Sequence, residues 1–137
     1  MQDFKKLRAW QKSHALALAI YRATDLFPDG ERFGLKRQLR DAAISVGSNL
    51  AEGSSRQGDA DFRRFVFFAL GSLSEIEAQL LVARDLGFLS RVMCGRLWSD
   101  VVEVRRMLCT LNRRLSGKFG ASPRSSGRNR EPEAGGL

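Results

Sequence analysis

One stretch in the middle of the chain, FRRFVFFALGSLSEIEAQLLVARDLG at positions 62–87, constrains the fold more than any other. Apolar residues recur along it at alternating spacings of four and three, as on a helix face that packs against other helices. This seam consists of Phe62, Val66, Ala69, Leu73, Ile76, Leu80 and Ala83. Further apolar residues lie off the seam, and one small protomer cannot enclose them all. We therefore predict a homo-oligomer whose interface contains Phe65, Phe67, Phe68 and Leu70.

Three more segments show helical periodicity, so the sequence predicts four helices, at positions 4–26, 35–52, 59–85 and 90–115. The inward face of the first is expected to contain Phe4, Leu7, Trp10, Ala17, Leu18 and Tyr21. Asp59 and Ser90 suit the N-caps of the last two helices, and Gly87 followed by Phe88 suits a Schellman ending. The short connections predict an all-α fold, an antiparallel up-down-up-down four-helix bundle.

Composition divides the chain into two parts. Residues 1–116 carry the helical patterns and are expected to form the bundle, whereas positions 117–137 are rich in Gly, Ser, Pro and Arg. Such a segment has little apolar surface to bury, so contacts cannot offset the conformational entropy that ordering it would cost. We expect a disordered C-terminal tail.

The chain is strongly basic, with a formal net charge of +8 and a pI near 10.5. A surface of this sign favours anionic partners, RNA or DNA above all, although solubility alone is the alternative explanation. Arg outnumbers Lys in the basic stripes, which suits bidentate contact with phosphates. The candidate nucleic-acid-binding residues are Lys5, Arg8, Lys12, Lys36, Arg37, Arg40, Arg63, Arg64, Arg105, Arg106, Arg113 and Arg114.

Motifs for metal, cofactor and nucleophilic chemistry are missing from the sequence. His14 is the only histidine, so a di-metal bundle with paired Glu-x-x-His motifs is excluded. Cys94 and Cys109 are expected on one helix roughly 22 Å apart, too far for a disulfide and unlike zinc-ligand spacing. No phosphate-binding loop, dinucleotide fingerprint or nucleophile elbow occurs. We predict no metal, no cofactor and no enzymatic activity.

The polar residues His14, Ser48, Asn49 and Glu52 form the one cluster that invites a chemical interpretation. A hydrolase using His14, Asn49 and Glu52 is one hypothesis, with the imidazole as general base. Asn49, however, continues an apolar stripe, so it should face inward and need a hydrogen-bond partner, and Glu52 can reach Arg56. We favour a structural polar network formed by all four residues. Gly71 is expected to permit close packing of helices.

The ordered set of motifs resembles one known family. The motifs are DFKKLRAWQKSHALALAIYRAT, then FP-x-x-ERFGL-x-x-QLR-x-AA, SNLAEG and F-x-x-F…ALGSLSE-x-E-x-QL…A-x-DLG. They are similar to those of the four-helix-bundle proteins encoded by intervening sequences of bacterial 23S ribosomal RNA genes. The resemblance implies a left-handed bundle that assembles as a homopentamer. It also suggests kinship with the pentameric accessory variability proteins of retroelements, which bind nucleic acid and a reverse transcriptase.

One position departs from that family pattern. Many of its members have proline where this chain has Gly47, and either residue weakens a helix, so a kink or irregularity is expected at positions 45–48.

Two functions are carried forward. The first is a non-enzymatic, homo-oligomeric, pentameric bundle that binds nucleic acid as an accessory protein. The alternative is a protein–protein scaffold with no nucleic-acid role, its partner a reverse transcriptase or another protein. The longest uncharged runs, at positions 65–74 and 42–51, fall short of the roughly 20 residues that span a membrane. We expect no membrane partner and a cytoplasmic protein.

Overall fold

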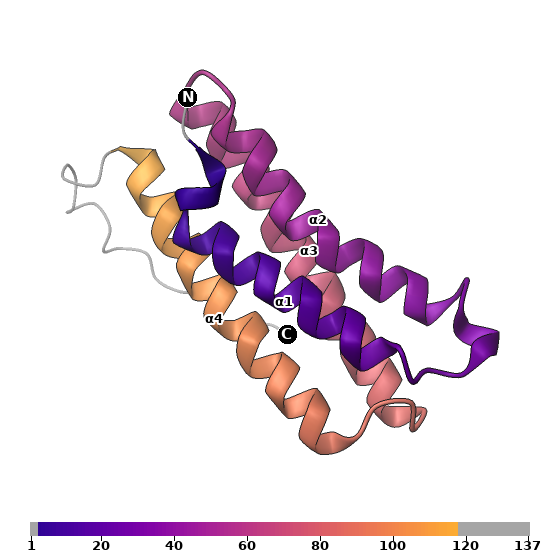
Figure 1. Cartoon of the computed structure of the whole chain (residues 1–137). Helices are drawn as coiled ribbons and strands as arrows, with labels where there is room; N and C mark the ends of the chain where they lie inside the picture. The colour runs from indigo at the N-terminus through magenta and orange to yellow at the C-terminus, as the bar shows by residue number, and fades with distance from the viewer. Residues whose placement is uncertain (1–2, 118–137) are drawn as a thin grey trace, which may run out of the picture.

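The computed structural model describes residues 3–117, and within that range the chain is all-α, as predicted. Its helices are α1 (Arg8–Thr24), α2 (Leu35–Ser54), α3 (Asp59–Asp85) and α4 (Arg91–Ser116). Each helix returns alongside the one before it, and α1 also packs against α4, which closes the bundle (Figure 1). The predicted tail lies outside the described residues except for Gly117, and the handedness of the bundle stays a prediction.

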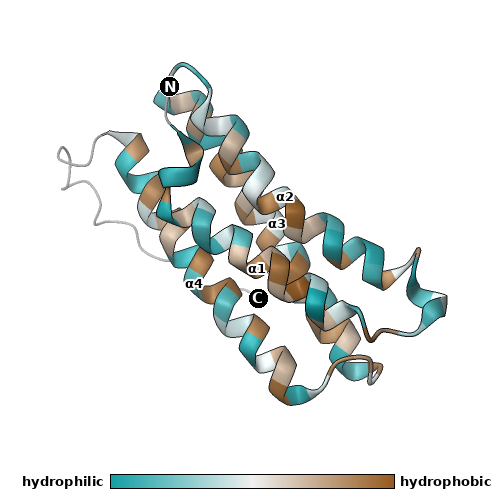
Figure 2. Ribbon diagram, in the orientation of Figure 1, coloured by the Kyte–Doolittle hydropathy of each residue, from teal (hydrophilic) through white to brown (hydrophobic). Residues whose placement is uncertain are grey.

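The predicted seam of α3 lies in the core of the bundle. All seven residues of the α3 seam are buried, and all of them except Phe62 have no exposed surface. They pack among Leu39, Val46 and Leu50 of α2 and Val101 and Leu108 of α4, which are also buried. Along the helices, hydrophobic residues alternate with hydrophilic ones, as in amphipathic helices (Figure 2).

The first helix differs from its prediction in both start and face. A 3-10 turn, η1 (Phe4–Lys6), comes first, and its N-cap Asp3 accepts a hydrogen bond from the Lys5 backbone N–H at 3.0 Å. Leu7 is extended, so α1 begins only at Arg8. The predicted inward face is wrong at Leu18 and Tyr21, which are 43% and 38% exposed. The buried positions are Ala9, Ser13, Leu16, Ala17, Ile20 and Thr24.

Two of the three predicted end motifs are confirmed. The Ser90 hydroxyl accepts from the Met93 N–H at 3.1 Å, which caps α4. At the end of α3 the Phe88 N–H donates to the Ala83 carbonyl at 2.9 Å and Gly87, with φ 81°, donates to Arg84 at 3.0 Å, a Schellman ending. The cap predicted at Asp59 is wrong: Gly58 is the N-cap, and Asp59 is the first helical residue.

Glycines mark the closest helix contacts, though not where expected. α2 continues as a helix through Gly47 without the predicted irregularity. A Cβ there would lie 3.1 Å from Trp10 Nε1, so Gly47 makes room for the indole of α1. At Gly53 a Cβ would lie 2.7 Å from Phe62 Cδ1, which sets how closely α2 and α3 approach. Gly71 is exposed and would have no neighbour within 4 Å, so it permits no close packing inside the protomer.

By length and composition alone, α3 is apolar enough to cross a membrane, with a window of mean hydropathy 1.5, of which 39% is buried. The cause lies in its two apolar faces. One face is the core seam, and the outward face carries Phe67, Phe68 and Val82, which are 51%, 48% and 47% exposed. A core helix of a soluble protein meets the same criterion.

Candidate nucleic-acid interface

The twelve candidate basic residues divide into two groups when their ion pairs are considered. Five of them lie within 4 Å of a carboxylate. These pairs are Lys12–Glu103 (3.4 Å), Arg37–Asp41 (3.6 Å), Arg40–Asp25 (2.9 Å), Arg64–Asp61 (2.8 Å) and Arg105–Glu77 (2.6 Å). The other seven form no ion pair with another residue between positions 3 and 117. A phosphate meets less competition at this second group.

Arg40 is committed to holding α1 against α2. Its Nε donates to the Thr24 hydroxyl at 2.8 Å, and its terminal nitrogen donates to the Tyr21 carbonyl at 2.8 Å and to Asp25 at 2.9 Å. The guanidinium also lies 4.3 Å from the centre of the Tyr21 ring. Thus Arg40 satisfies a carbonyl at the C-terminal end of α1, where the helix leaves such groups unpaired.

Arg105 has an equivalent role between α3 and α4. Its two terminal nitrogens donate to the two oxygens of Glu77 at 2.6 and 3.0 Å, a fork-to-fork pair. A further bond reaches the Ser74 hydroxyl at 3.1 Å. The Arg105 and Glu77 side chains are only 30% and 21% exposed, so the pair is largely covered by neighbouring atoms.

Three arginines without an acidic partner between residues 3 and 117 line one hollow between α1 and α4. They are Arg8, at the first position of α1, and Arg106 and Arg114 of α4, two turns apart on one face. The hollow has a volume of about 270 Å³. Its remaining lining residues are Leu7, Ala9, Met107, Thr110 and Leu111. We call this hollow the arginine groove.

Arg8 lies at the N-terminal end of a helix, a position that is unfavourable for a cation. The N-terminal end of a helix carries a partial positive charge, so a cation there costs a few tenths of a kcal/mol, up to about 1 kcal/mol. No acidic residue lies in the first turn of α1 to compensate. Arg114, in contrast, lies in the last turn of α4, where the dipole favours a cation. Arg8 therefore adds positive charge at the groove where helix stability alone disfavours it.

The remaining candidates lie apart from the arginine groove or on its edge. Lys5 is exposed on η1, and Lys36 lines a separate hollow of about 320 Å³ with Tyr21 and Arg32. Arg63 donates to Asn112 at 3.1 Å, between α3 and α4. Arg113 donates weakly to Thr110 at 3.4 Å, beside the groove.

The four residues predicted to form one polar network are not joined by hydrogen bonds in the structure. Asn49 donates to the carbonyl and hydroxyl of Ser45 at 2.9 and 3.1 Å, and Glu52 pairs with Arg56 at 2.8 Å. His14 is exposed and stacks on Trp10 instead, with ring centres 4.9 Å apart and planes at 14°. Ser48 is exposed on α2. No hydrogen bond joins the four within residues 3–117: His14 and Ser48 line one hollow between α1 and α2, whereas Asn49 and Glu52 bond to Ser45 and Arg56.

A different polar contact spans the α2–α3 interface. The Ser45 and Ser72 hydroxyls lie 2.8 Å apart, and Gln79 donates to Gln38 at 3.3 Å. Gln79 is 8% exposed, and its Oε1 has no hydrogen-bond partner among the described residues. The seven-residue spacing of Ser72 and Gln79 places both on one face of α3, and this was the sequence signal for the contact. Using that signal would have required knowing which side of α3 packs against α2.

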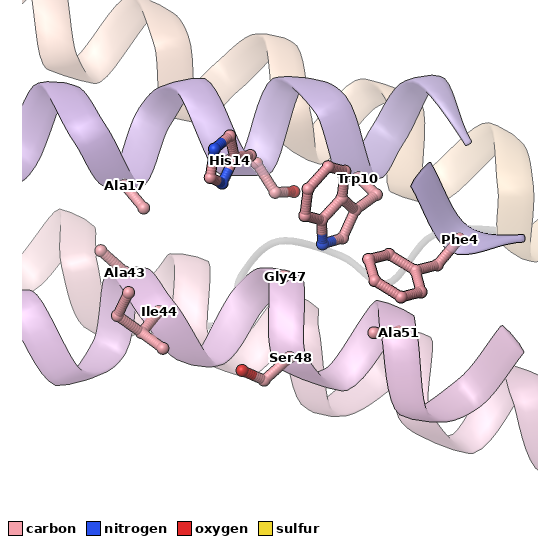
Figure 3. Close-up of a pocket in the computed structure, with 10 residues that line it drawn as sticks. Phe4, Trp10, His14, Ala17, Ala43, Ile44, Gly47, Ser48 and Ala51 are labelled. Carbon is pink, nitrogen blue, oxygen red and sulfur yellow. The ribbon is translucent and has the colours of Figure 1, made fainter. Parts of the chain in front are cut away.

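A second hollow, of about 260 Å³, lies between α1 and α2 (Figure 3). Phe4, Trp10 and His14 line one side, and Ile44 and Ser48 lie on the other. Phe4 packs edge-on to Trp10 at 5.0 Å between ring centres, so the three rings form a continuous column. We call this hollow the aromatic groove.

The residues predicted at an oligomer interface lie on the outer side of α3. Phe67 and Phe68 are about half exposed, whereas Phe65 and Leu70 are half-buried at its flanks. Phe65 and Phe68 pack edge to face at 5.5 Å, and the Arg64 guanidinium lies 4.9 Å from the Phe65 ring. These contacts leave much of the apolar face uncovered in the single chain.

Metal-binding geometry does not occur in the described part of the chain, where no three His, Cys, Asp or Glu residues come together. Cys94 is buried and Cys109 is exposed, and both are free thiols.

Comparison with known proteins places this bundle in a family. The chain matches the family described as 23S rRNA-intervening sequence protein over residues 5–110. It is also similar to the crystal structure of a protein of unknown function from the S23 ribosomal protein family of Bacteroides thetaiotaomicron, with a TM-score of 0.69 and 23% identity. That likeness, which concerns the fold, covers 76% of this chain and 97% of the other. No curated protein matches. Because the family match spans most of the bundle, the chain belongs to the 23S rRNA-intervening sequence protein family.

Proposed function

We propose that this protein is a non-enzymatic, homo-oligomeric accessory protein of the cytoplasm that binds nucleic acid through the arginine groove. The observation that carries the proposal is the convergence of Arg8, Arg106 and Arg114 on one hollow, without an acidic partner among residues 3–117. Guanidinium groups donate in pairs to phosphate oxygens, and release of counterions from the nucleic acid drives such binding. The net charge of +8 adds long-range attraction.

Oligomerisation is the second part of the proposal. Phe67, Phe68 and Val82 lie on the side of α3 opposite its core seam, and a neighbouring subunit would remove them from water. Gly71, on the same side, leaves space for a close approach. A ring, with five subunits as the family resemblance implies, would repeat the arginine groove by symmetry. Several grooves on one assembly would bind a long strand more tightly than a single groove can.

Nucleic-acid binding is tested by removing the three groove arginines together. The variant Arg8→Gln, Arg106→Gln, Arg114→Gln should bind a labelled RNA or DNA more weakly at low salt. Because each phosphate contact contributes about 0.7 on a single strand and about 0.9 on a duplex, the slope of log Kd against log salt should fall by about 2–3. Fluorescence anisotropy over a salt series measures both quantities.

The matched control loses the same charge elsewhere. Its substitutions are Arg22→Gln, Arg91→Gln and Arg96→Gln, at exposed arginines that line neither the arginine groove nor the hollow between α1 and α2. This control should keep most of the salt slope. Equal losses in the two variants would mean that net charge, not the arginine groove, determines binding, and absence of binding by the unmodified protein would end the proposal.

Oligomerisation is tested on the outer face of α3. Phe67→Ser with Phe68→Ser should lower the particle mass in light scattering toward the 15.3 kDa of one chain, because both rings are about half exposed in the protomer. Val92→Ser, at another exposed apolar residue, should leave the mass unchanged. A mass of one chain for the unmodified protein at micromolar concentration would contradict the proposal.

A protein–protein scaffold is the second candidate, and one observation favours it. A hollow of about 410 Å³ lies beside the α3–α4 turn, lined by Ala23, Leu26, Phe88 and Met93 among others. Leu26 is 88% exposed there, and a partner seated in the hollow would remove it from water. Under this function, Leu26→Ser would abolish capture of a protein partner after nuclease treatment while the arginine-groove variant retained it.

A further inference from the structure

We propose that the aromatic groove takes an unpaired base, so that the preferred ligand is single-stranded nucleic acid rather than a duplex. This inference rests on the proposed function and assigns to His14 the role of a stacking platform. A base inside a duplex has both faces covered by its neighbours. Only an unpaired base can offer a face to a protein ring.

The His14 ring is held ready for such a contact. It lies nearly parallel to Trp10, and Trp10 in turn is supported edge-on by Phe4. The edge of the indole packs against Gly47 of α2, and this contact restrains the column of three rings on the α2 side. His14 itself is exposed at the rim of the groove (Figure 3). A ring held in this way loses little rotamer entropy when a ligand stacks on it.

The shape and polarity of the aromatic groove suit a flat, uncharged group. Small residues of the two helices, Ala17, Ala43, Gly47 and Ala51, leave the hollow of about 260 Å³ open. Ile44, 48% exposed, lies across from the rings, and the Ser48 hydroxyl is the one polar group that α2 adds. No charged residue lines the hollow. It lies just below the usual size range of small-molecule pockets, which suits a single base.

Positive charge lies at both ends of the aromatic groove, where phosphates of a bound strand would run. Lys5 and Lys6 are exposed on η1, next to Phe4. Beyond the other end, Arg32 and Lys36 line the separate hollow of about 320 Å³ with Tyr21 and form no ion pair within residues 3–117, while Asp41 of that hollow pairs with Arg37. Trp10 and Tyr21 are eleven residues apart on α1, or roughly 16 Å. A groove with rings in the middle and cations at both ends matches the chemistry of single-stranded binding sites.

The experiment uses Trp10 as its own reporter. The chain has two tryptophans, so Trp98→Phe leaves Trp10 as the only indole, and Trp98 lies away from the aromatic groove between α3 and α4. Two probes of equal length and charge are compared, an oligothymidylate and an abasic oligonucleotide. The oligothymidylate should quench Trp10 emission and bind about tenfold more tightly than the abasic probe, as expected for stacking of one base. Anisotropy with a labelled probe and the unmodified chain gives the same ratio without Trp98→Phe.

Substitutions at His14 then locate the base. His14→Ala should remove the tenfold preference, whereas His14→Phe, which keeps a ring, should retain it. Leu18→Ala is the matched control, because Leu18 is an exposed residue one turn further along α1 that does not line the groove. This control should keep the preference.

Three outcomes would overturn the inference while leaving the proposed function standing. The first is equal binding of the two probes, and the second is an unchanged preference in His14→Ala. The third is quenching of Trp10 by N-acetylphenylalanine amide but not by oligothymidylate, which would assign the groove to an aromatic side chain of a protein. Failure of both probes to bind at low salt would overturn the proposed function as well.

Discussion

Arg105 and Arg106 are neighbours in the sequence, yet they belong to two different regions of the molecule. Arg105 points to the α3–α4 seam, where Glu77 and Ser74 hold its guanidinium. Arg106 lies on the other side of α4, in the arginine groove, without an acidic partner between residues 3 and 117. One residue step turns a helix by about 100°, and that rotation separates a structural arginine from one available to a ligand. A list of basic residues read from the sequence therefore does not separate structural arginines from arginines that are available to a ligand.

The largest expected effect is a loss of stability at Arg40, a second structural arginine, which lies between α1 and α2. Arg40→Ala should lower the free energy of unfolding by about 2–3 kcal/mol, because it removes charge-assisted hydrogen bonds to Thr24 and Tyr21. The exposed Asp25 contributes little to that figure. Urea unfolding followed by circular dichroism measures the change. Lys36→Ala, one turn earlier on α2, should lower the free energy of unfolding by less than about 0.5 kcal/mol. A loss as large as that of Arg40→Ala would contradict the distinction between structural cations and cations available to a ligand.

The second prediction concerns the two neighbours themselves. Arg105→Ala should cost about 1–2 kcal/mol of stability, because the pair with Glu77 is forked and largely covered. Arg106→Ala should change stability by less than about 0.5 kcal/mol but should weaken nucleic-acid binding and lower its salt slope by about 1. Denaturant unfolding and salt-dependent anisotropy on the same two variants test both statements. Stability losses of equal size would contradict the comparison.

The sequence predicted one kind of feature well, the burial of regularly spaced apolar residues. The α3 seam is right because its apolar positions recur at spacings of four and three along the whole helix. On α1 the run ALALAI, positions 15–20, is apolar on all sides, so periodicity could not define a face. Leu18 and Tyr21 were accordingly placed inward, while Leu16 and Ile20 are the buried ones.

Contacts between helices were harder to predict, because they depend on how each helix is rotated and how far it slides along its neighbour. Arg105 and Glu77 are 28 positions apart, and nothing in either helix alone pairs them. The same holds for the glycines: Gly47 accommodates Trp10 rather than bending α2, and Gly71 faces open space. The arginine groove likewise needs Arg8 of α1 beside α4, a relation that appears only in the folded bundle.

The smallest expected effect is the sharpest test of the two arginines, because it keeps the charge and changes only the shape of the cation. Arg105→Lys should cost about 0.5–1 kcal/mol, since an ammonium cannot reproduce the fork on Glu77 and also reach Ser74. Arg106→Lys should leave stability unchanged within about 0.3 kcal/mol and keep the salt slope, because a phosphate contact tolerates either cation. Thermal unfolding in low and high salt separates the two variants. If Arg106→Lys destabilised the protein as much as Arg105→Lys did, Arg106 would be bound by the protomer too, and the arginine groove would lose its claim to a free cation.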